Sequence, residues 1–170
     1  LFLLTADSLA SVLPTIRSRC VSFAVAPVSP VDCARYCTAQ GVEKKAAALY
    51  SELFDGHIGT VLAAARDEAR MAQVEKAMEL ARDAAARDSY AAAVLLAGYE
   101  KDRAGAAALL TDFRAVAAAG LRGSSHAPLQ GREAQRALRL AESAIRNLNG
   151  NSNPKITLAV LAAKLGPAGQ

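Results

Sequence analysis

The residues of this chain best suited to a chemical role are two arginines, Arg17 and Arg19, which flank Ser18 and precede Cys20. A guanidinium keeps its positive charge at physiological pH and presents a planar fork of N–H donors that matches phosphate oxygens. In phosphoryl transfer such a group stabilises the negative charge that spreads over the γ-phosphate oxygens. The residue types therefore predict either a phosphate-directed cation, which we assign to Arg19, or two ordinary surface arginines beside a helix end.

The other parts needed for nucleotide hydrolysis do not occur in the sequence. It contains no Gly-x-x-x-x-Gly-Lys-Ser/Thr loop to cradle phosphates, and no expected strand ends in the paired carboxylates that would hold Mg²⁺. His57 lies in the stretch Asp55–Gly59, which we interpret as a turn, and we assign it no role as a base or ligand. We therefore expect no turnover of ATP or of another substrate by this chain alone.

The cysteines do not predict a metal centre. Cys33 and Cys37 are four residues apart, which places both on one face of a helix. A structural zinc site needs four ligands, and His57 and His126 are the only histidines that could complete one. We expect these two cysteines to be small buried apolar side chains instead. The odd cysteine count, with no visible signal peptide, favours a reducing cytoplasmic compartment.

The composition indicates helices. Of the 170 residues, 52% are hydrophobic but only 5% are aromatic, and alanine supplies much of the apolar count. Alanine has the highest helix propensity, so we expect a mainly α-helical protein. The net charge of +4 is made of interspersed charges without a long basic block. This pattern favours a solvated surface over direct binding of nucleic acid.

Residues 1–27 differ from the rest of the sequence. The apolar run Leu1–Leu4 predicts a buried strand over residues 1–5, and the alternation of Val21, Phe23 and Val25 allows a second short strand. A short helix lies between them. Two short strands cannot form an independent sheet, so we interpret this segment as a remnant of a larger α/β domain.

The remaining sequence predicts eight helices in two groups. In residues 28–66, three helices are expected to form a small bundle: one capped by Ser29 and ended by Gly41, one over about 43–54, and one starting near Thr60. In residues 67–170 we expect five helices: Asp67–Arg87, Ser89 to about Gly105, about 106–120, Arg132–Leu148, and a last one capped by Asn153.

The stretch Leu13-Pro14-Thr15-Ile16-Arg17-Ser18-Arg19-Cys20 resembles the late part of the AAA+ ATPase core of bacterial DNA clamp-loader subunits, which share a Ser-Arg-Cys signature. The resemblance implies that 1–27 is the C-terminal remnant of that core, 28–66 a three-helix lid domain, and 67–170 a helical collar domain for oligomerisation. It covers nearly the whole chain in layout. Its specific motif is confined to residues 3–20.

The resemblance also implies roles for individual residues. Arg19 would be an arginine finger that acts in trans on ATP held by a neighbouring subunit, and Ser18 and Cys20 complete the signature. Members that bind ATP carry Gly-Ser-x-Arg-Asp-Ala at the third lid helix. Here the equivalent stretch is Gly56-His57-Ile58-Gly59-Thr60-Val61, so Gly59 stands in the position of the arginine. The stretch 148–154 and the apolar helix after it resemble the non-hydrolysing branch of the family.

The expected role is therefore that of a non-catalytic subunit of the DNA polymerase III holoenzyme, a DNA-directed DNA polymerase and nucleotidyltransferase. The implied partners are the gamma/tau and delta subunits, and, through the assembly, the sliding clamp and primer–template DNA. No cofactor or metal is expected in this chain, since ATP would be bound by the neighbouring subunit and the family's zinc module would precede Leu1. Two alternatives stay open: an ATPase subunit of the gamma/tau type, and a helical scaffold or nucleic-acid-binding bundle.

Overall fold

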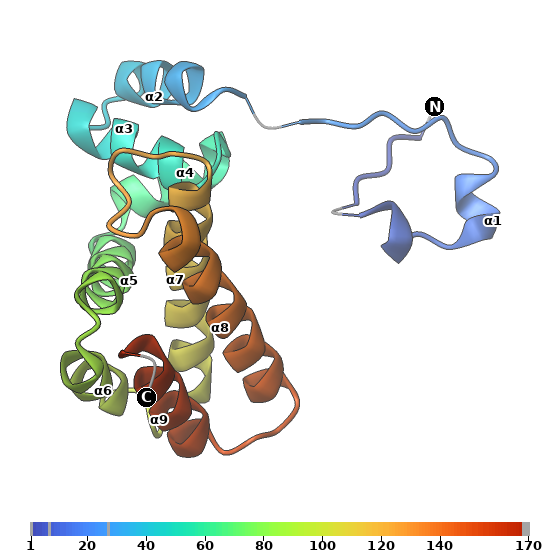
Figure 1. Ribbon diagram of the computed structural model, residues 1–170. Coiled ribbons are helices and arrows are strands. Elements are labelled where there is room, and N and C mark those ends of the chain that lie inside the picture. The colour runs from blue at the N-terminus through green and yellow to red at the C-terminus, as the bar shows by residue number, and fades with distance from the viewer. Residues whose placement is uncertain (1, 7, 27, 168–170) are drawn as a thin grey trace.

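The computed structural model describes residues 2–6, 8–26 and 28–167. Within these residues it contains nine α-helices, one short 3-10 helix and no strand, so the prediction of a mainly α-helical protein is confirmed. Figure 1 shows two regions: a body built from the helices α2–α9, and an N-terminal arm that runs away from it. We call residues 2–26 the arm throughout.

The arm has little regular structure of its own. It contains only the 3-10 helix η1 (Leu9–Ser11) and the single-turn helix α1 (Pro14–Arg17). The strands predicted at each end are wrong for the described residues, because 2–5 and 21–25 have no partner strand and pair with nothing. Leu1 and Pro27, where the first strand and the first domain boundary were expected, lie outside the described residues.

Nearly all of the arm's large apolar side chains are exposed, which is the opposite of their usual placement. They are Phe2, Leu3, Leu4, Leu9, Leu13, Ile16, Val21, Phe23 and Val25.

Three short helices open the body: α2 (Pro30–Ala39), α3 (Lys44–Leu53) and α4 (Ile58–Arg66). The predicted start of α2 is confirmed, since the Ser29 hydroxyl accepts a hydrogen bond from the Asp32 amide at 3.1 Å. The third helix begins at Ile58 and not near Thr60, so Ile58 and Gly59 are helical and do not belong to the preceding turn. Gly56 makes that turn, with φ +72 and its Cα close to the Val28 carbonyl.

Five further helices complete the body. They are α5 (Glu68–Ala86), α6 (Ser89–Ala97), α7 (Arg103–Leu121), α8 (Gly131–Asn149) and α9 (Pro154–Leu165). Helix α7 packs between α5 and α8, while α6 packs on α9 (Figure 1). The predicted cap and end of α6 are wrong. Asp88, one residue before Ser89, accepts a hydrogen bond from the Ala91 amide. The chain then leaves the helix after Ala97, and Asp102 caps α7.

The core is continuous across both groups of helices and is built largely from alanine, leucine and valine. This packing requires the backbone of α7 to lie close to the loop that joins α7 to α8. A Cβ on Gly120 of α7 would lie 2.0 Å from the Leu129 carbonyl oxygen, so only glycine allows α7 to pass under the α7–α8 loop. Among the described residues, α7 is the one helix whose length and composition would suit a membrane span. Half of that stretch is buried against other helices, as in the central helix of a bundle.

Candidate functional site

The Ser-Arg-Cys signature forms the turn that closes helix α1 in the arm. The Ser18 hydroxyl donates to the Thr15 carbonyl at 3.2 Å, and the Arg19 amide donates to the Ile16 carbonyl at 3.0 Å. The side chains of Arg19 and Cys20 are exposed, and no ion pair involves Arg19 within the described residues. The turn therefore presents a guanidinium to solvent, with its donors available to a phosphate on another molecule.

The structure does not bring the other singled-out residues to Arg19. His57 and Gly59 lie at the start of α4 in the body, while Arg19 lies on the arm (Figure 1). His57 is exposed and its side chain makes no capping hydrogen bond. A Cβ on Gly59 would meet nothing within 4 Å, so close packing does not require a glycine there. Glycine at this position thus leaves the start of α4 without a guanidinium at position 59.

Cys33 and Cys37 are both fully buried in the core, as the sequence predicted. Burial, together with the neighbouring Cys33 thiol, raises the pKa of Cys37 to about 11. Cys37 is therefore protonated at neutral pH and is neither a nucleophile nor a thiolate ligand. Within the part of the chain that the structure describes, no three His, Cys, Asp or Glu side chains cluster as a metal site would require.

A polar cluster that the sequence did not reveal joins α3 to the α7–α8 loop. Both the Ser124 hydroxyl and His126 contact the Glu52 carboxylate, His126 through Nδ1 at 2.9 Å. Burial raises the pKa of Glu52, but the hydrogen bonds from His126 and Ser124 outweigh this and hold it below its usual range. The carboxylate lies between hydroxyl and imidazole, so the serine donates to Glu52 and not to the imidazole, unlike the serine of a Ser-His-Asp triad. The cluster therefore holds α3 against the α7–α8 loop.

A second polar cluster connects α5, α7 and the end of α3. Asp112 is 4% exposed and accepts two hydrogen bonds from the Arg70 guanidinium and one, at 3.0 Å, from the Gln73 side chain. The Arg70 guanidinium also lies 5.7 Å from the centre of the Phe54 ring. Partners 42 positions apart in sequence give no local signal, which is why sequence reasoning missed this pair.

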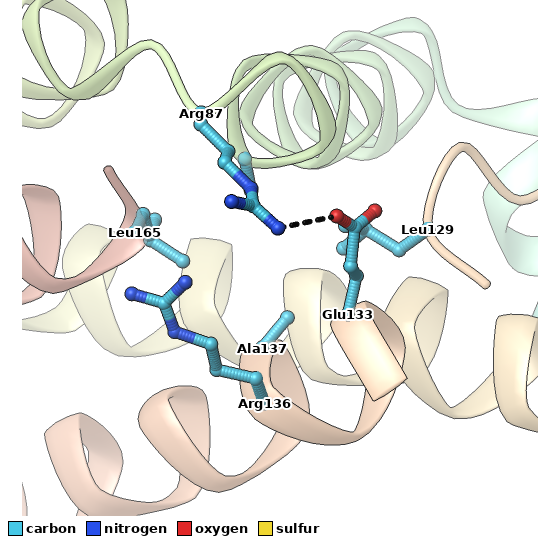
Figure 2. Close-up of a pocket in the computed structure, with 7 residues that line it drawn as sticks. Arg87, Leu129, Glu133, Arg136, Ala137 and Leu165 are labelled. Carbon is cyan, nitrogen blue, oxygen red and sulfur yellow. Dashed lines mark hydrogen bonds and ion pairs between the residues drawn. The ribbon is translucent and has the colours of Figure 1, made fainter. Parts of the chain in front are cut away.

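The body also has a small cavity, shown in Figure 2, of about 20 Å³ where the end of α5 meets α8 and α9. Arg87 reaches across it to the Glu133 carboxylate at 3.2 Å, and Arg136 lies below (Figure 2). A volume of this size holds about one water molecule. The cavity therefore cannot take a nucleotide or another substrate.

No family model, no curated protein and no solved structure matches the chain. A function is therefore inferred from Arg19, from its surroundings and from the arrangement of the helices.

Proposed function

We propose that this chain belongs to a delta-prime-type clamp-loader subunit of bacterial DNA polymerase III, which donates Arg19 to ATP held by a neighbouring subunit. The observation that carries the proposal is the Ser18-Arg19-Cys20 turn, which sits on an arm outside the helical body with the Arg19 side chain exposed. An arginine finger that acts in trans has to be exposed in its own chain. The exposure of Arg19 supports such a role.

In this proposal the hydrolysis itself takes place on the neighbour. Arg19 approaches the γ-phosphate of ATP bound by a gamma/tau-type subunit and stabilises the charge that develops in the transition state. The bond from Ser18 to the Thr15 carbonyl closes the turn from which Arg19 leaves the arm. Because the guanidinium comes from a different chain, the rate depends on how closely the two subunits are docked. Clamp loading on primed DNA is then coupled to assembly of the ring.

Gly59 favours one of the two subunit types. It supports a subunit that does not hydrolyse ATP, and it argues against an ATPase subunit of the gamma/tau type. A glycine has no side chain with which to contact a bound phosphate, and the space beside Gly59 is open. The choice of glycine is therefore not forced by packing. The ATPase alternative predicts ATP binding by the full-length subunit alone, which equilibrium dialysis would detect.

The body supplies the docking scaffold in this proposal. We assign α2–α4 to a lid domain and α5–α9 to a collar domain that holds related subunits together. The Glu52–His126 contact and the approach of the Arg70 guanidinium to the Phe54 ring at the end of α3 tie the two groups of helices to each other. They give the lid a defined position relative to the collar.

The test uses the full-length subunit assembled with its ring partners. Arg19→Ala should lower DNA-stimulated ATP hydrolysis, and the rate at the one site that Arg19 faces should fall on the order of 10³-fold. Arg17→Ala is the matched control, because Arg17 is exposed on the same arm two residues earlier. It should leave the rate unchanged. Wild-type turnover by the Arg19→Ala assembly would contradict the proposal.

A further inference from the structure

Helices α8 and α9 form an open groove on one side of the body. Its volume is about 370 Å³, and it is lined mainly by Leu140, Ser143, Asn147, Ile156, Val160 and Lys164. The first three come from α8 and the last three from α9. This is the size of a cleft that takes several side chains of a ligand.

Helix α9 is apolar on two sides, and only one of them is covered. Leu158, Leu161 and Leu165 are between 1% and 4% exposed and face the core. Ile156 and Val160, four residues apart and so on one face, are 63% and 46% exposed at the groove. A helix that is apolar all round is normally buried all round. The second face of α9 therefore lacks a partner within the described residues.

The net positive charge of the chain is concentrated on the same two helices. Six cations against two carboxylates lie in α8 and α9, namely Arg132, Arg136, Arg139, Arg146, Lys155 and Lys164 against Glu133 and Glu142. The other 14 cations of the chain are balanced by 14 carboxylates. The whole net charge of +4 thus belongs to the helices that border the groove.

Two of these cations lie on α8 beside the lining residues of the groove, and they have no ion-pair partner of their own. Arg139 and Arg146 are exposed, and neither takes part in an ion pair among the described residues. They lie four residues before and three residues after Ser143, on the same face of α8 as that lining residue. Lys164 belongs to the α9 side of the lining. The groove combines an apolar stripe with cations on both helices.

We propose that this groove binds an acidic amphipathic helix of a partner subunit. Apolar side chains at three- and four-residue spacing would pack on Ile156 and Val160, and flanking carboxylates would pair with Arg139, Arg146 and Lys164. The inference rests on the proposed function, in which residues 67–170 hold related subunits together. It adds the surface used and the chemistry of the partner.

The same features disfavour two other occupants. A second copy of this chain would bring its own excess of cations against this one, and like charges across an interface are repulsive. A nucleic acid is bound chiefly through phosphates that meet a row of cations. Here the centre of the surface is Ile156 and Val160, with the cations at its sides.

The test measures binding of a synthetic helix of about five turns, with leucine on one face and glutamate on the flanks, to the full-length subunit. A peptide of the same composition with scrambled order is the control ligand. The patterned peptide should bind and the scrambled one should not. Ile156→Ser combined with Val160→Ser should weaken binding about tenfold or more. These side chains are exposed, so folding should be retained, as circular dichroism would verify.

Charge variants give an independent readout. Arg139→Glu with Arg146→Glu should weaken binding and reduce its dependence on salt. Lys44→Glu with Lys45→Glu changes the net charge equally on exposed positions of α3 and should have no effect. Equal binding of both peptides, displacement by primed DNA, or self-association that the Ile156→Ser/Val160→Ser variant abolishes would each overturn the proposal. Peptide binding needs neither ATP nor Arg19, so its failure leaves the arginine-finger test standing, and the reverse also holds.

Discussion

The arm and the body of this molecule differ in how much apolar surface they bury and in which candidate site residues they carry. The body, α2–α9, has a continuous core, capped helices and two buried or half-buried polar clusters that link its helices. The arm carries Arg19, yet it buries almost none of its large apolar side chains. In the proposed function, contacts with other polypeptide would cover these apolar side chains. Under the same proposal, the comparison teaches that the chemistry is placed in the part of the chain that buries the least apolar surface.

The largest expected effect is on the body's buried ion pair. Asp112→Ala removes the acceptor for Arg70 and leaves a partly buried guanidinium without its partner, which costs about 3–5 kcal/mol. Urea unfolding monitored by circular dichroism measures the loss. The matched control is Asp32→Ala, whose exposed pair with Arg35 contributes about 0–1 kcal/mol. Equal losses in both variants would show that the polar cluster between α5 and α7 is not a stabilising feature.

Truncating one apolar side chain in each region tests the comparison itself. Leu109→Ala opens a cavity in the core at a fully buried position and should destabilise the chain by about 2–5 kcal/mol. Phe23→Ala removes a larger side chain, but Phe23 is 85% exposed, and the unfolding free energy of this chain should not change. Thermal unfolding of the two variants separates them. A large loss for Phe23→Ala would mean that the arm packs on the body.

The Glu52 contact should make stability depend on acid pH. The pKa of Glu52 is lowered in the folded state, so its contribution is present above the ordinary glutamate value of about 4.3. That contribution is lost as pH falls through the folded pKa. Wild type should therefore lose more unfolding free energy than Glu52→Gln between pH 7 and the acid range. Identical pH profiles from urea titrations would exclude the contact with His126 and Ser124 as a source of stability.

The smallest effect is expected at Gly59. Gly59→Ala lies within α4 with open space beside it, and should stabilise the chain by about 0.4–1 kcal/mol. Gly56→Ala is the control three residues earlier. Its Cβ would lie 1.8 Å from the Val28 carbonyl oxygen at a φ of +72, so it should destabilise. A melting temperature that falls for both variants would argue that Gly59 is required by the fold.

Features that depend on neighbouring residues could be predicted from the sequence, whereas features that depend on residues far apart in the sequence could not. The starts of α2 and α9 were predictable, because Ser29-Pro30 and Asn153-Pro154 combine a capping side chain with proline at the first helical position. The start of α6 was displaced by one residue, since Asp88 and Ser89 are both capping residues and the aspartate is used. Local chemistry predicts that a helix begins, and the choice between adjacent caps depends on the surrounding structure.

Long-range features were less accessible. The two strands expected in the arm were wrong because pairing depends on partners that an alternating pattern does not specify. Cys33 and Cys37 were correctly expected to be buried, since both lie on one face of one helix. The Glu52–His126 contact joins residues 74 positions apart and was not predicted. The groove likewise needed the structure, because it forms only where α8 meets α9.

Single-turnover ATP hydrolysis by the assembled clamp loader tests the central claim most directly, with the wild-type subunit compared with Arg19→Ala at saturating ATP. We predict unchanged ATP occupancy and a rate at the neighbouring site lower by on the order of 10³-fold, since the guanidinium acts on the transition state and not on binding. Equal rates for the two assemblies, with Arg19 the only residue changed, would contradict the claim that this chain completes its neighbour's ATPase site.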